Sequence, residues 1–140
     1  MKLTGKITAI NDSLYRFGKI WLDEFKIAVN SKNFSELQPL RQNLEQFIDR
    51  NIVFIDNMDD VGNSEPIRKA ELDILQFEKT TVLPKFLVFE TFDTTTTDEQ
   101  ITEAYKGMMM TTSQEQEKLN KLYSLIDAYA DKYEFPKPIE

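Results

Sequence analysis

Apolar residues recur at alternating steps of three and four along four long segments, and this rhythm limits the possible folds more than any other feature of the chain. Steps of three and four place side chains on one face of an α-helix, so each segment presents an apolar stripe. Further apolar residues widen each stripe beyond the seam of a two-stranded coiled coil, as the interior of a helix bundle requires. We therefore predict helices over residues 4–30, 35–58, 66–92 and 98–134.

Short polar segments separate these four stretches and define how the helices are connected. Ser35 and Gln38 have the spacing of a capping box at the start of the second helix, and Pro66 opens the third. Thr97 or Asp98 is expected to cap the fourth. Because short connections make consecutive helices antiparallel, the whole chain is predicted to form one all-α domain. Its architecture is an antiparallel up-down-up-down four-helix bundle with a long C-terminal helix.

Residues 80–92 are rich in β-branched and aromatic residues, which also suit a β-strand. The apolar period favours a helix, however, and a lone strand would have no pairing partner in this chain. We expect Thr81 and Val88 on the apolar stripe of that helix, and Val82, Phe86 and Phe89 on a second apolar row. Pro84 should disrupt it, because the carbonyl group of Thr80 loses its N–H donor.

The composition excludes several classes of protein. With no histidine and no cysteine, the 140-residue chain cannot build a Ser-His-Asp or Cys-His catalytic site, nor the Glu-x-x-His di-iron site of many bundles. A formal net charge of -7 argues against nucleic-acid backbones and anionic membrane surfaces as partners. No apolar run approaches the ~20 residues that a membrane span needs. We therefore expect a soluble, acidic, non-enzymatic domain without a cofactor.

Polar residues interrupt the apolar stripes, and three of them are candidates for a ligand site: Glu24, Asn51 and Glu115. In an antiparallel bundle, Asn51 and Glu115 fall near one level, beside Leu14 and Ile74, while Glu24 lies nearer one end. A buried carboxylate bonded to an amide could fix the helix register or hold a ligand. In the alternative interpretation, Glu24 and Glu115 lie at the edge of their stripes and reach water.

An all-carboxylate site for Mg²⁺ or Ca²⁺ is chemically allowed, because both ions prefer oxygen ligands. The acidic segment 56–62 does not fit the EF-hand loop, however, since Met58 and Val61 stand at its third and sixth positions. No metal ligands are therefore predicted.

Aromatic residues gather near the C-terminal end of the fourth helix. Tyr129, Tyr133 and Phe135 are predicted either to form an exposed patch for a protein partner or to close the end of the bundle.

Several short segments resemble those of a family of small all-helical bacterial surface or lipoprotein-like proteins of unknown function, typified in spirochaetes. They are Leu40-Arg41, Phe77-Glu78, Thr97-Asp98-Glu99-Gln100 and Tyr129-Ala130-Asp131-Lys132-Tyr133. The resemblance implies export to the periplasm or cell surface after removal of a signal segment; without it, a cytoplasmic address is expected. It brings no catalytic residue.

The leading prediction for function is a structural or interaction module that binds a protein partner. Two alternatives stay open: a bundle that binds a small ligand or divalent metal, and an acidic inhibitor that mimics nucleic acid. The second alternative requires carboxylates gathered along one exposed face.

Overall fold

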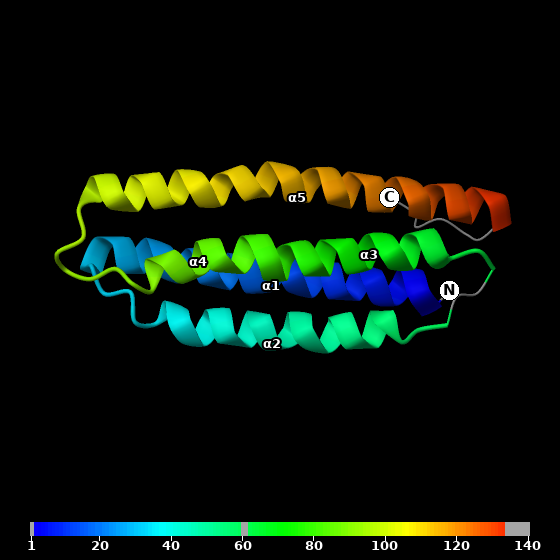
Figure 1. The fold of residues 1–140 in the computed structure, drawn as a ribbon, viewed down its shortest axis with the longest axis horizontal. Coiled ribbons are helices and arrows are strands. Elements are labelled where there is room, and N and C mark those ends of the chain that lie inside the picture. Colours follow the sequence, from blue (N-terminus) through cyan, green and yellow to red (C-terminus); the bar gives the residue numbers. More distant parts are fainter. Residues whose placement is uncertain (1, 60–61, 134–140) are drawn as a thin grey trace.

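The computed structural model describes residues 2–59 and 62–133, and every regular element in these residues is helical (Figure 1). Three elements, α3, η1 and α4, follow one another without a break and form one rod, which is called the third rod below. The elements are α1 (Lys2–Ser31), α2 (Leu37–Asp56), α3 (Glu65–Phe77), η1 (Glu78–Val82), α4 (Leu83–Phe89) and α5 (Asp98–Tyr133).

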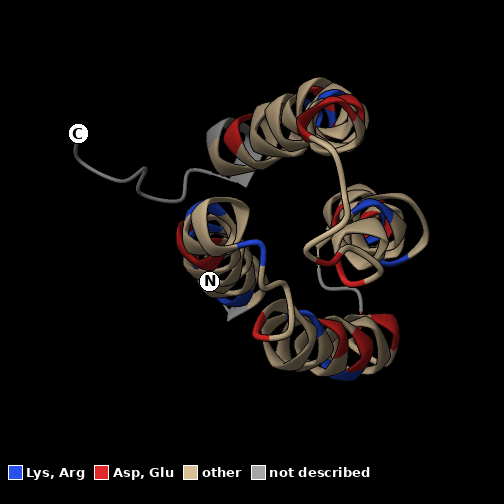
Figure 2. Cartoon of the chain, turned by 90° about the vertical axis from the view of Figure 1, so that its left-hand side faces the viewer, with Lys and Arg blue, Asp and Glu red and all other residues tan. Residues whose placement is uncertain are grey.

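The four rods lie side by side in alternating directions, which confirms the predicted antiparallel four-helix bundle with a long C-terminal helix (Figures 1 and 2). The predicted helix limits differ from the observed ones by up to three residues. Helix α2 packs between α1 and the third rod, and α5 packs along the third rod. Over the described residues, no helix has the length and apolar character needed to cross a membrane.

Aromatic side chains form the centre of the core near the end that holds the α1–α2 and α4–α5 connections. The ring of Trp21 stacks on that of Phe86 with centroids 4.1 Å apart, and Phe25 meets Phe89 edge-on at 4.8 Å. Trp21 and Phe89 are fully buried. Such contacts add to the energy of area burial, so this cluster anchors α1 against α4.

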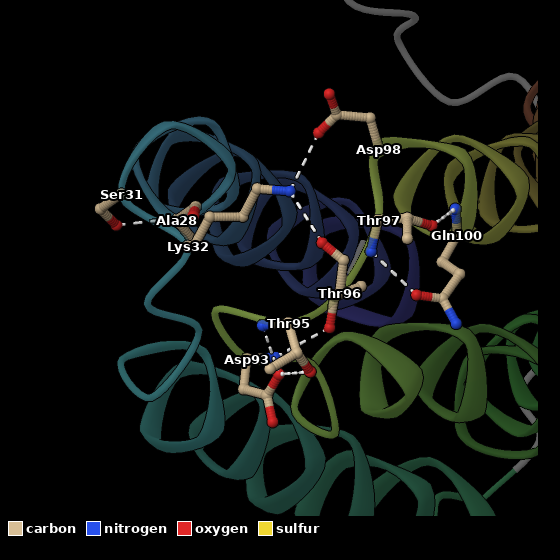
Figure 3. Close-up of polar contacts among 9 residues, drawn as sticks. All are labelled: Ala28, Ser31, Lys32, Asp93, Thr95, Thr96, Thr97, Asp98 and Gln100. Atoms are coloured by element: carbon tan, nitrogen blue, oxygen red, sulfur yellow. Dashed lines mark hydrogen bonds and ion pairs between the residues drawn. The ribbon is translucent and has the colours of Figure 1, made fainter.

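At this end of the bundle, one lysine joins two connections that are distant in sequence (Figure 3). Lys32, in the α1–α2 connection, donates from Nζ to the carbonyl oxygen of Thr96 and to Oδ1 of Asp98, both at 2.9 Å. The backbone of Lys32 has a φ of 58°, a left-handed conformation that non-glycine residues rarely adopt. Its contacts with the α4–α5 connection help to offset that strain.

Helix α5 begins with a complete capping box, which confirms Thr97 as the cap (Figure 3). The backbone N–H of Gln100 donates to Oγ1 of Thr97, and the N–H of Thr97 donates to Oε1 of Gln100. The box predicted for α2 is wrong. Ser35 precedes that helix and donates to Oδ1 of Asn33, while Glu36 stands at the N-cap without a side-chain cap.

The third rod contains a π-helical turn, η1, which ends at Val82, two residues before Pro84. The N–H of Leu83 donates to the carbonyl of Glu78, five residues back. The helix disruption expected at Pro84 therefore takes the form of one helical turn that is wider than an α-helical turn. The extra residue in this turn rotates the helix that follows. For this reason the prediction for Val88 is wrong: Val88 is 41% exposed, and Phe86 and Phe89 take the buried positions.

An ion pair with little exposure ties α2 to the C-terminal end of α4. The guanidinium group of Arg41 donates to both carboxylate oxygens of Glu90, and the two side chains are only 12% and 10% exposed. Two parallel N–H···O bonds fix the orientation of both groups. A second pair, between Lys79 and Asp49, joins the same two rods but is 46% exposed on each side.

Replacing Arg41 with methionine should lower the free energy of unfolding by roughly 2 kcal/mol, because the carboxylate of Glu90 would stay shielded from water without a cation. Urea denaturation measures this loss. Lys79→Met is the matched control and should cost clearly less, because water solvates the exposed Asp49. Equal losses in the two variants would contradict this account.

Candidate ligand-binding groove

A solvent-open groove with a volume of about 630 Å³ lies between α1 and α5. The two walls come from these helices, and the floor comes from the third rod and from Leu44 of α2. Most of the surface is apolar. The apolar lining residues are Leu14, Leu22, Leu44, Ile74, Val82, Phe86, Met108, Met109 and Leu119.

The groove exists because α1 and α5 are the two neighbouring rods that do not pack closely over their described residues. Gly18 contributes to the opening, because it lines the α1 wall without a side chain. A Cβ atom added at Gly18 would meet nothing within 4 Å. Tyr15 and Met109, at the rim, are 72% and 41% exposed, so the apolar character of the groove continues to its mouth.

Two carboxyl groups meet in the groove. Glu78, at the start of η1, is 6% exposed and lies within hydrogen-bonding reach of Glu115 on α5. Burial raises the pKa of Glu78 far above its ordinary value, and the hydrogen bond with Glu115 raises it further. At neutral pH Glu78 therefore keeps its proton.

A second buried carboxyl group lies two turns away along α3. Glu71 is completely buried, neither of its oxygens has a hydrogen-bond partner, and burial raises its pKa to about 8. The side chain of Asn11 on α1 is near enough to lower that pKa in part, although no well-formed hydrogen bond joins the two. Glu71 is therefore neutral at pH 7.

Asn11 lines the groove and is 8% exposed, yet neither polar atom of its amide has a hydrogen-bond partner. Tyr123 of α5 lies beside it at the rim. Burial raises the pKa of the Tyr123 hydroxyl, the nearby amide of Asn11 lowers it in part, and the charges of Glu71 and Asp12 raise it. Polar atoms buried without partners cost free energy, so a polar group bound in the groove beside Asn11 would stabilise it.

The structure brings only one of the three predicted ligand-site residues into the groove. Glu115 lines it, as do Leu14 and Ile74. Glu24 is half-buried but does not line the groove. The amide of Asn51 donates to the carbonyl of Phe47 in its own helix at 2.8 Å, so its hydrogen bond is local.

Tyr129 is buried, with 9% exposure, and its hydroxyl lies against Gly62 in the α2–α3 connection. It therefore closes the end of the bundle and does not form an exposed partner patch. The side chain of Tyr133, and Phe135, lie outside the described residues.

The sequence analysis missed Asn11, Glu71 and Glu78. A signal for the two glutamates is present in the sequence, because Glu71 stands four residues after Ile67 and three before Ile74. Glu78 stands four residues after Ile74. Both positions therefore fall on the same buried face as Ile67 and Ile74.

Among the described residues, no group of three or more carboxylates is arranged to hold a metal ion. Glu78 and Glu115 alone would supply fewer oxygen ligands than Mg²⁺ or Ca²⁺ takes from its surroundings. Acidic and basic residues occur on all four rods and are interspersed along them (Figure 2).

Comparisons with protein-family models, with curated proteins and with solved structures find no match to this chain.

The free energy of unfolding should fall as the pH rises from 4.5 to about 8, because folded Glu71 holds a proton that the unfolded chain releases. This one group contributes a slope of up to about 1.4 kcal/mol per pH unit. Glu71→Gln removes it and should give a flatter profile in urea denaturation at several pH values. Glu103→Gln, on the exposed face of α5, should keep the slope of the original protein. Parallel profiles for Glu71→Gln and the original protein would contradict neutral Glu71.

Proposed function

We propose that the protein is a non-enzymatic binding module that holds an elongated, mostly apolar small molecule in the groove between α1 and α5. The observation that carries this proposal is an apolar groove with a few convergent polar groups, Asn11, Glu78 and Glu115. Small-molecule sites commonly combine these features within volumes of roughly 300–1,000 Å³.

The dimensions of the groove define the shape of the ligand. On α1 the lining extends from Asn11 to Lys26, which corresponds to roughly 20 Å at the helical rise of ~1.5 Å per residue. An alkyl chain or a string of small rings would follow this length. The exposed side chains of Tyr15 and Met109 would cover part of a bound chain at the rim.

The chemistry of the groove supports binding over catalysis. The chain has no histidine or cysteine, and the carboxyl group of Glu78 keeps its proton at neutral pH. A neutral, buried acid is a hydrogen-bond donor that can position a ligand. The lining also lacks glycine-rich loops and clustered cations, which phosphate-bearing ligands require.

Filling the groove at Gly18 tests this proposal directly. The neutral apolar dye N-phenyl-1-naphthylamine should bind saturably, with a rise in fluorescence, and Gly18→Leu should weaken that binding at least tenfold. The leucine side chain would enter space that is open above Gly18 and would occupy the ligand volume.

Gly5→Leu is the matched control, because Gly5 lies on the same helix, also has open space around its Cβ position, and does not line the groove. Each substitution removes a glycine from a helix and should raise stability by roughly 0.5–1 kcal/mol. Dye binding should be lost only in Gly18→Leu. Equal binding by the two variants, or no saturable binding by the original protein, would refute the groove as the site.

A further inference from the structure

We infer that the ligand of this groove carries a protonated amine, which sits between the carboxyl groups of Glu78 and Glu115. The inference rests on the proposed function and names the chemical class of the ligand: a linear amine with an apolar chain. Three independent features support it, namely the carboxyl pair, the unpartnered amide of Asn11 and the distribution of charge around the groove.

The carboxyl pair supplies the binding chemistry. Glu78 lies in the floor of the groove and is almost fully buried, and Glu115 lies in the adjoining α5 wall within hydrogen-bonding reach of it. Two carboxyl groups this close cannot both ionise without a cation. An ammonium group offers three N–H donors and one positive charge, so it can bridge both side chains.

The side chain of Asn11 is a second buried polar group in the groove, at a different position along it from the carboxyl pair. Its side chain is more than nine-tenths buried, lines the groove, and leaves both its donor and its acceptor unbonded. If every other buried polar group had a hydrogen-bond partner, the carboxyl pair could be explained by a structural role alone. The Asn11 amide lies near Glu71 and Tyr123 but forms no well-formed hydrogen bond with either, so it is free to bond a molecule that enters the same groove.

Charge around the groove favours a cation over an anion. The deep carboxyl groups would repel a carboxylate or phosphate head group, and the lysines of the lining, Lys19 and Lys26, are exposed at the rim. Besides the pair, the titratable and charged side chains that line the groove are Asp12, Tyr15, Lys19, Asp23 and Lys26 of α1 and Tyr123 of α5. Glu71 of α3 does not line the groove but acts on Glu78 through its charge. Helix α2 contributes only the apolar Leu44.

The proton balance of binding follows from this arrangement. The amine arrives as an ammonium ion, Glu78 releases its proton to the solvent, and the ammonium forms hydrogen bonds with the two carboxylates. One proton is released for each amine bound. Affinity for the amine therefore rises with pH, by up to about tenfold per unit while Glu78 is protonated in the free protein.

Three ligands of equal chain length test the inference: decylamine, 1-decanol and decanoate. Calorimetric titrations at pH 6, 7 and 8 should show decylamine affinity rising with pH, with release of one proton measured in two buffers of different ionisation enthalpy. Affinity for 1-decanol should be independent of pH, and decanoate should bind most weakly at every pH.

Glu78→Gln keeps the shape of the side chain and removes its ability to ionise. This variant should bind decylamine at least tenfold more weakly at pH 8, lose the pH dependence and keep its affinity for 1-decanol within about twofold. The retained binding of 1-decanol shows that the variant is folded. Glu71→Gln should keep the pH dependence of decylamine binding, because Glu71 does not line the groove.

The possible outcomes separate the two proposals. Equal, pH-independent binding of decylamine and 1-decanol, or tighter binding of decanoate, would overturn the amine inference and leave the groove as a binding site. Decylamine binding that is unchanged in Glu78→Gln would also overturn it. Failure of all three ligands to bind would refute both the inference and the proposed function.

Discussion

The burial of two glutamate side chains without a cation is the constraint on which this structure depends. Glu71 and Glu78 lie one above the other on the inner face of the third rod, where a bundle normally places aliphatic residues. Each side chain can be buried because it stays protonated, and a neutral carboxyl group avoids the large free-energy cost of burying a charge. The cost that remains lies in unmet hydrogen bonds, at the carboxyl group of Glu71 and at the neighbouring amide of Asn11, which lines the groove.

The π-helical turn connects this polar stretch with the aromatic cluster. Glu78 is the first residue of the turn, and the added residue brings Val82, Phe86 and Phe89 onto the same inner face. Phe86 then stacks on Trp21 and also forms part of the groove floor. A rigid, fully packed end of the bundle therefore continues directly into an open groove, and the ion pair of Arg41 with Glu90 holds the packed end together.

The architecture could be predicted from the sequence because each helix carries its own apolar period and each connection is short. The groove could not. Whether two rods of a bundle pack closely depends on tertiary packing. The sequence around Gly18 does not indicate that this glycine faces an open space. Glu115 was found because it interrupts a stripe, whereas Glu71 and Glu78 were not singled out, since charged residues are seldom fully buried. The π turn added to the error by shifting the apolar period midway along the third rod.

The protonation of the buried glutamates can be observed directly through the side-chain carboxyl carbon resonances of ¹³C-labelled protein between pH 4 and pH 9. The account predicts that two glutamate resonances keep the chemical shift of the protonated form at pH 7, one missing in Glu71→Gln and the other in Glu78→Gln. If every glutamate in the protein titrates near its ordinary pKa, between about 4 and 5, the buried acids are charged and the account is contradicted.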